Sequence, residues 1–166
     1  EIKPTTKVLG LLLNEPDPFR VPLQREVEAA GKTQQIEIVP MMVKGGGELP
    51  AAYEEMMRRG VDGVLVQPSL PLAMAATLAV KSRLAAVSYF REFALAGGLI
   101  SLGADQADIF RTVAGYVDRV LKGAKTTDLP VQQVTKFELV VNQKTARALG
   151  LTLSPMFLTR ADGVFE

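Results

Sequence analysis

The stretch Val8-Leu9-Gly10-Leu11-Leu12-Leu13-Asn14 decides the fold class of this 166-residue chain. It is apolar almost without interruption, as strands are when helices cover both faces of a parallel sheet. Longer amphipathic segments and further short apolar runs follow it in alternation, which is the pattern of βα units. The sequence therefore predicts an α/β fold with a three-layer, doubly wound, mostly parallel sheet.

Further strands and helices are expected along the rest of the chain. The expected strands are 36–41, 63–67, 85–89, 99–102 and 137–141, and the expected helices are 18–30, 48–59, 72–83, 105–122 and 144–149. Gly31 is placed where a glycine commonly ends a helix, and Gly123 closes the helix that Asp105 can cap. Residues 124–134 contain Pro130 and are the best candidate for a linker.

The helix after Asp105 has an apolar stripe that needs a partner. Its members recur at helical spacing and are Ile109, Val113, Tyr116, Val117, Val120 and Leu121. Exposed apolar patches of that size usually mark an interface. We therefore expect a homodimer through residues 105–122, in which this segment packs against or is exchanged with a second copy.

Composition excludes several classes of function. The chain has no cysteine and no histidine, which removes thiolate chemistry, disulfides, the commonest metal ligand and the commonest general base. We expect no metal, no cofactor and no catalytic residue. A net charge of +1 gives no field that would attract nucleic acid, and no apolar run has the length of a membrane span.

Polar side chains gather where the expected strands end, which is where open α/β sheets bind ligands. The first strand is followed by Asn14, Glu15 and Asp17, the third by Gln67 and Ser69, and the fourth contains or precedes Ser88, Tyr89, Arg91 and Glu92. Together these amide, hydroxyl, carboxylate, guanidinium and aromatic groups suit a small zwitterion with an apolar side chain.

Each of these residues also has a purely structural interpretation. Asn14 and Asp17 are common in turns and at helix starts. Gln67 and Ser69 can satisfy backbone groups, Ser88 has no histidine to activate it, and Tyr89 can be a core aromatic residue. These alternatives remain open at the level of the sequence.

Several ordered motifs resemble the substrate-binding proteins of bacterial ABC uptake systems, the group that includes tryptophan- and tyrosine-type binding proteins. The motifs occupy 14–19 (NEPDPF), 23–30 (LQREVEAA), 88–105 (SYFREF to AGGLISLGAD), 114–118 (AGYVD), 135–142 (TKFELVVN), 144–151 and the end of the chain at 160–166. The resemblance extends over nearly the whole chain and corresponds to the second lobe and C-terminal tail of such proteins.

That resemblance implies one lobe of a type I periplasmic-binding-protein-like fold. Residues 1–104 would form the ligand-binding lobe, and residues 105–166 the crossover helix, linker and tail, in the same domain or swapped with a partner. The function implied is capture of an amino acid or related small molecule between two lobes and delivery to ABC permease subunits. The first lobe would be missing here, the location would be periplasmic or extracytoplasmic, and a leader before Glu1 would have been cleaved or lie outside this sequence.

Within the lobe, the resemblance places ligand contacts at Asn14, Gln67, Ser69, Tyr89 and Glu92. Tyr89 or Phe90 would stack on an apolar ligand, Glu92 or Asp17 would accept from an ammonium group, and Arg91 would pair with a carboxylate. The alternative function is a single-domain receiver-like signalling or sensory module, but Gln67 stands where a receiver needs an aspartate. A hydrolase is not expected either, because the chain has neither a histidine nor a Gly-x-Ser-x-Gly nucleophile elbow.

Overall fold

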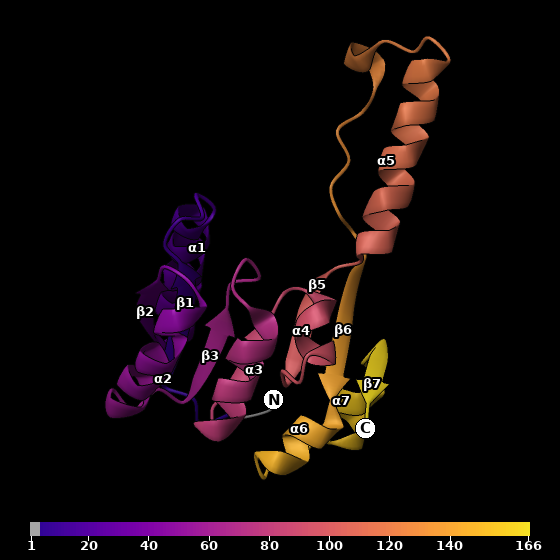
Figure 1. The fold of residues 1–166 in the computed structure, drawn as a ribbon. Coiled ribbons are helices and arrows are strands. Elements are labelled where there is room, and N and C mark those ends of the chain that lie inside the picture. Colours follow the sequence, from indigo (N-terminus) through magenta and orange to yellow (C-terminus); the bar gives the residue numbers. More distant parts are fainter. Residues whose placement is uncertain (1–3) are drawn as a thin grey trace.

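Strand β1 (Val8–Asn14) lies inside a seven-stranded sheet and pairs with a parallel neighbour on each side. A computed structural model describes residues 4–166, and the strand order is β2-β1-β3-β4-β5-β6-β7 (Figure 1). Only β5 and β6 pair antiparallel, while the other neighbours are parallel. The expected mostly parallel α/β sheet is confirmed.

The elements follow one another in regular alternation up to β5. The strands after β1 are β2 (Glu37–Val43), β3 (Gly63–Val66), β4 (Ala85–Ser88), β5 (Ile100–Ala104), β6 (Phe137–Asn142) and β7 (Gly163–Phe165). The helices are α1 (Arg20–Gln34), α2 (Leu49–Arg58), α3 (Leu72–Lys81), α4 (Arg91–Leu95), α5 (Gln106–Leu121), α6 (Gln143–Ala148) and α7 (Pro155–Leu158), with 3₁₀ turns η1 (Gly46–Glu48) and η2 (Thr126–Asp128).

Both faces of the sheet are covered, which explains the apolar run in β1. Leu12 packs into a cluster with Tyr53 and Met56 of α2 and Phe93 of α4. Farther along the sheet, Leu99, Ile100, Val141 and Ala146 form a second cluster, joined by residues from 149–161. Leu11, Leu12 and Leu13 each have 0% of their surface exposed, so side chains of both orientations are buried. Residues 137–166 thus complete the sheet that residues 4–104 begin.

The end of α1 differs from the expectation. Gly31 does not end the helix, which continues to Gln34 and stops at Gln35 in a left-handed conformation with φ of 56°. Gly31 is instead a site of close approach, because a Cβ there would lie 2.5 Å from Cγ1 of Ile38 on β2. A glycine inside a helix can serve either purpose, and only the packing distinguishes them.

Besides the two 3₁₀ turns, two short α-helices and one short strand were not expected from the sequence. They are α4, α7 and β7, each of which has five residues or fewer. Segments of this length contain too few residues to show a hydrophobic period. Arg91 and Glu92, which were expected only to follow the fourth strand, both belong to α4.

Residues 105–136, which we call the arm, leave the sheet after β5 and return to it at β6 (Figure 1). The Asp105 side chain caps α5 by accepting a hydrogen bond from the Asp108 N–H at 3.1 Å. Lys136 closes the base of the arm, with its Nζ atom 2.7 Å from Oδ2 of Asp105. The expected cap, helix and following linker are therefore present.

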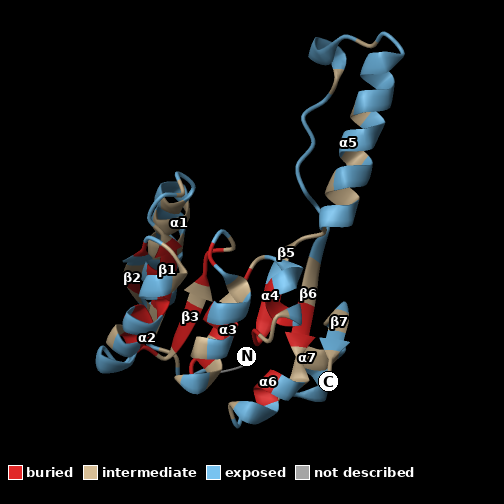
Figure 2. Cartoon of the chain, viewed as in Figure 1, coloured by how far each residue is buried: buried red, intermediate tan, exposed pale blue. Residues whose placement is uncertain are grey.

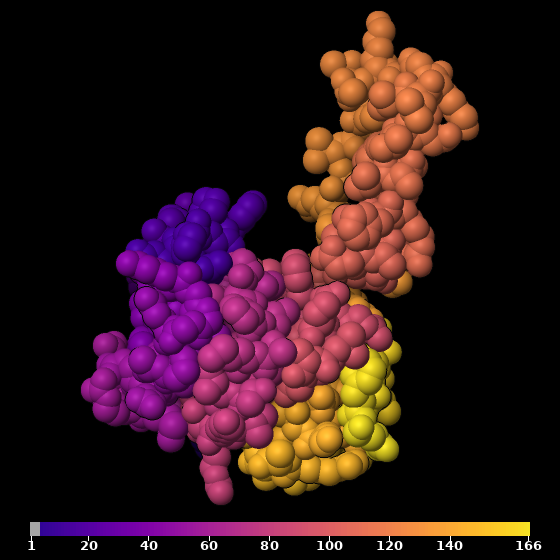
Figure 3. All heavy atoms as spheres, in the orientation of Figure 1, coloured from indigo at the N-terminus to yellow at the C-terminus, as the bar shows by residue number. Residues whose placement is uncertain are grey.

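Most of the arm is in contact with solvent rather than with the sheet. Helix α5 contains no buried residue (Figure 2). Val113 and Val117 expose 49% and 51% of their surface, and Leu121 exposes 82%. In the space-filling view the arm stands clear of the rest of the molecule (Figure 3). The apolar stripe of α5 is thus not folded back on this chain's own sheet.

Candidate ligand-binding site

A pocket of about 570 Å³ lies at the carboxyl ends of the parallel strands. Its walls come from the β1–α1 loop, the first turns of α1, the β3–α3 loop and the segment between β4 and α4. The lining residues are Asp17, Phe19, Pro22, Leu23, Glu26, Pro68, Ser69, Tyr89 and Phe90. This is the edge at which open α/β sheets place their ligands. In Figure 3 the surface is hollowed between α1 and the base of the arm.

Asp17 is held in a fixed orientation by neutral donors. The Phe19 N–H donates to its Oδ1 atom at 2.9 Å, and the Gln67 Nε2 group donates to its Oδ2 atom at 2.8 Å. Hydrogen bonds from the Ser69 hydroxyl and the Phe19 N–H keep the pKa of the Asp17 carboxyl below its ordinary value, against a smaller opposing effect of burial. The carboxylate is therefore ionised at neutral pH, and these hydrogen bonds fix the orientation of its two oxygens.

The side chains of Gln67 and Asn14 hold Asp17 and Ser69 in place. Gln67 is buried and accepts the Asn14 N–H at 2.9 Å through Oε1 while its amide nitrogen reaches Asp17. The Asn14 amide nitrogen donates to Oγ of Ser69 at 3.2 Å. Asn14 and Gln67 thus connect β1 and β3 to the residues that line the pocket, and they do not themselves line it.

The aromatic wall is formed by Tyr89 and Phe90. Their rings meet edge to face with centroids 5.5 Å apart. Burial, and secondarily the negative charge of Asp17, raises the pKa of the half-buried Tyr89 hydroxyl. The tyrosine is therefore a neutral hydrogen-bonding group beside a carboxylate.

Gly103 of β5 allows Tyr89 to take its place. A Cβ atom at Gly103 would lie 1.8 Å from the carbonyl oxygen of Tyr89, a distance that no side chain can occupy. The strand that leads into the arm is therefore in direct backbone contact with the residue that forms the pocket wall.

The remaining predicted site residues lie elsewhere. Ser88 is buried and donates to the Val66 carbonyl at 2.7 Å, while Glu15 is exposed in the turn after β1. Arg91 pairs with Glu138 of β6 and lies over the ring of Phe165 on β7, 5.7 Å from its centroid. Glu92 is exposed on α4. Of the nine predicted residues, the structure places Asp17, Ser69 and Tyr89 in the walls of this pocket.

Sequence reasoning did not identify the contribution of α1. Phe19, Pro22, Leu23 and Glu26 follow one another at three- to four-residue spacing along the first turns of this helix. That spacing places them on one side of a helix and was the signal available. It was not decisive, because an apolar side of a helix more often faces the protein core.

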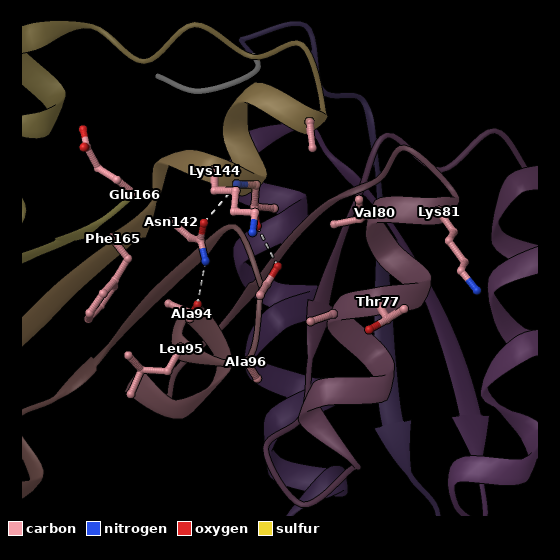
Figure 4. A pocket seen from close by; sticks show the side chains of 14 residues that line it. Thr77, Val80, Lys81, Ala94, Leu95, Ala96, Asn142, Lys144, Phe165 and Glu166 are labelled. Atoms are coloured by element: carbon pink, nitrogen blue, oxygen red, sulfur yellow. Dashed lines mark hydrogen bonds between the residues drawn. The ribbon is translucent and has the colours of Figure 1, made fainter.

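A second hollow of about 570 Å³ lies between α3, α4, α6 and β7 (Figure 4). Since β6 runs antiparallel to its neighbour β5, α6 lies at the opposite edge of the sheet from the first pocket. The polar side chains at the centre of this second hollow already form hydrogen bonds within the fold. Asn142 donates to the Ala94 carbonyl at 3.0 Å, and the Thr145 hydroxyl donates to the Gly97 carbonyl at 2.8 Å.

Within residues 4–166, no three Asp or Glu side chains come together in a way that could hold a metal ion. In the same part of the chain, no helix is both long and apolar enough to cross a membrane.

Comparison with known proteins gives one family and several solved structures. The family model of ABC transporter substrate binding proteins matches residues 1–165. A conserved domain protein from Vibrio cholerae O1 biovar El Tor shares the fold with a TM-score of 0.87 at 22% identity. The ABC domain of a Streptococcus pneumoniae protein in complex with L-Trp does so with a TM-score of 0.86 at 24% identity.

A third structure is the ligand-free, open form of a substrate binding protein with adhesive properties from Clostridium difficile, with a TM-score of 0.78 at 14% identity. Each match covers 99% of this chain but only 56%, 57% and 56% of the respective solved chains. The chain therefore spans little more than half the length of these structures. No curated protein sequence matches it.

Proposed function

Because the chain belongs to the family of ABC transporter substrate binding proteins, we propose that it forms one wall of a cleft in which a small organic solute is captured for uptake. This membership confirms the family expected from the sequence motifs. Members of the family bind solutes rather than convert them, in agreement with the expectation that the chain is not an enzyme.

The pocket at the carboxyl ends of the strands is the observation on which this proposal rests. It combines apolar and aromatic walls with the oriented groups of Asp17, Ser69 and Tyr89. Such a mixture of apolar surface and a few fixed polar groups is typical of small-molecule sites. The amino-acid class receives support from the L-Trp complex of the Streptococcus pneumoniae relative.

The exposed apolar face of the arm favours a second lobe as the opposite wall of the cleft. Its apolar stripe is exposed, and its inner side forms a groove of about 420 Å³ lined by Val113, Val117 and Val120 of α5 and by Leu129 and Pro130 of the returning segment. We assign this face to another lobe of the same protein. A second copy of this chain, bound through 105–122, is the alternative partner when that lobe is absent.

The proposal extends to partners and location by way of the family. The solute would be handed to ABC permease subunits on the extracytoplasmic side of a bacterial membrane. A receiver-like signalling module receives no support, because Gln67 at the end of β3 is buried and bonded to Asn14 and Asp17 rather than offering a carboxylate.

A thermal-shift screen of the full-length gene product tests the proposal. The screen uses amino acids, small amines and small organic acids, and a true ligand at one hundred times its Kd should add about 2.7 kcal/mol to stability. Tyr89→Ala should remove most of the shift. Thr77→Ala, which alters only the second hollow, is the control. The proposal fails if no solute stabilises the protein, or if both variants respond alike.

A further inference from the structure

The walls of the ligand pocket carry charge of only one sign. Asp17 and Glu26 are its two ionisable acids, and no lysine or arginine lines it. The other lining residues are aromatic, aliphatic, proline or serine. A negatively charged ligand group would therefore meet no counter-ion in these walls. A cationic group would meet the carboxylate of Asp17, while that of Glu26 is already paired with Arg25 at 2.8 Å.

Asp17 keeps its full charge because its partners are neutral. Its donors are a backbone N–H, an amide and a hydroxyl. Within residues 4–166, no lysine or arginine side chain forms an ion pair with it. An oriented carboxylate without a cation partner at the wall of an apolar pocket is a preformed site for an ammonium group.

The helix that follows Asp17 does not reverse this preference. The start of α1 is a place where anions are ordinarily favoured, because its first N–H groups point outward. Here the Asp17 carboxylate lies just ahead of that end, since its side chain accepts from the N–H of Phe19, the residue before the helix, and its carbonyl accepts from the Arg20 N–H at 3.1 Å. A carboxylate of the ligand would be repelled by Asp17 at this point.

The aromatic wall also favours a cation with an apolar body. The faces of aromatic rings attract cations and their area accommodates apolar groups. Tyr89 lies close enough to Asp17 for the negative charge of that carboxylate to raise the tyrosine pKa. An ammonium group at Asp17 would thus place the rest of the ligand against Tyr89 and Phe90.

We propose that this lobe binds the ammonium end of a ligand with an aromatic or apolar body, with Asp17 as the counter-ion and the Tyr89–Phe90 pair as the wall. The inference rests on the proposed function, because it concerns the same pocket. It assigns a ligand carboxylate, where there is one, to the facing lobe. Arg91, which pairs with Glu138, takes no part in it.

Isothermal titration of the full-length gene product separates these contributions. The probes are 2-phenylethylamine, L-phenylalanine and 3-phenylpropionate, which share an aromatic body and differ in charge. We expect the two amines to bind and the acid to bind at least about tenfold more weakly, as a charge-assisted hydrogen bond would give. Asp17→Asn should abolish the preference for the amines, while the control Glu54→Gln, at an exposed acid of α2 outside the pocket, should keep it.

Folding of the variants is checked by thermal melting, since Asn at position 17 still offers an oxygen to the Phe19 N–H. If Asp17→Asn does not fold, Phe90→Ala provides the second test. Phe90→Ala should weaken the binding of all three probes and leave the preference for the amines intact. Loss of that preference in this variant would count against Asp17 as the counter-ion.

The outcomes distinguish a failure of the ammonium assignment from a failure of the proposed binding function. Binding of 3-phenylpropionate as tight as that of the amines, or an unchanged preference in Asp17→Asn, overturns the ammonium assignment while the binding function stands. If none of the probes binds but another class of solute stabilises the protein in the thermal-shift screen, the inference is wrong and the proposed function survives. If nothing binds in either experiment, both are wrong.

Discussion

The sheet and the arm carry equally clear apolar patterns, yet only one of them is buried. Leu11, Leu12 and Leu13 of β1 have 0% of their surface exposed, whereas Val117 at the middle of the α5 stripe exposes 51%. The difference lies in what surrounds each pattern. Helices encoded by the same chain cover both faces of β1, whereas among the described residues the stripe borders only the returning segment of the arm. A hydrophobic period thus identifies an apolar face without identifying its partner.

The largest expected effect is a contrast between matched truncations in the two regions. Leu12→Ala should lower the free energy of unfolding of this chain by about 2–5 kcal/mol, because it leaves a cavity in the main core. Val117→Ala should change it by less than about 0.5 kcal/mol, as for an exposed site. Urea unfolding measures both. Both are measured on the monomer, at a concentration too low for self-association, and similar losses there would mean that the chain buries the α5 stripe against itself.

A smaller loss of stability is expected at the junction of the two regions. Gly103→Ala would bring a methyl group against the Tyr89 carbonyl and should cost about 1–3 kcal/mol, as overpacking does. Gly115→Ala is the control, because a Cβ there has open space around it, and it should stabilise α5 slightly. The two melting curves should shift in opposite directions. Equal shifts would show that β5 does not press on Tyr89.

The next effect concerns association rather than folding. The uncovered stripe should make this chain self-associate at micromolar concentration, and Val113→Ser with Val117→Ser should yield monomers without a loss of sheet stability. Light scattering and urea unfolding on the same samples test both parts. A chain that is monomeric before substitution would reject the dimer through 105–122.

The smallest expected effect is a dependence of the arm on pH. The ion-paired hydrogen bond from Lys136, followed by the bond from the Asp108 N–H, lowers the pKa of Asp105 from its ordinary 3.8. The stabilisation is therefore complete above pH 3.8 and is lost as the pH falls through the lower value of the folded arm. NMR of the α5 amides should show fraying in acid, while the amides of β1 should not change.

Asp105→Asn provides the control for this titration. Asparagine keeps a capping oxygen for the Asp108 N–H but has no charge to titrate. Its α5 amides should therefore show no fraying over the same acidic range. A titration that persists in this variant would assign the effect to another group.

Prediction from sequence worked where a pattern was long and local. The strand at 8–14 and the cap at Asp105 were expected where the structure has them. The same reasoning misplaced the end of α1 at Gly31, because close packing against Ile38 is a long-range property. The pairing of Arg91 with Glu138 was also not expected, because the two residues are distant in sequence.

The site was predicted in part for the same reason. The strand-end rule located the edge of the sheet, and three of the nine predicted residues line the pocket there. Whether a strand-end side chain points to solvent or supports a neighbour depends on bonds such as that between Gln67 and Asp17. The contact of the nine residues with a ligand remains a prediction.

Ala104 and Phe137 pair with each other, so the arm can be removed without separating β5 from β6. Because these positions face each other on adjacent antiparallel strands, the whole excursion of 105–136 begins and ends at one point. A two-residue β-turn spans such a gap. An Asn-Gly turn in place of 105–136 should therefore yield a minimal lobe with its sheet uninterrupted.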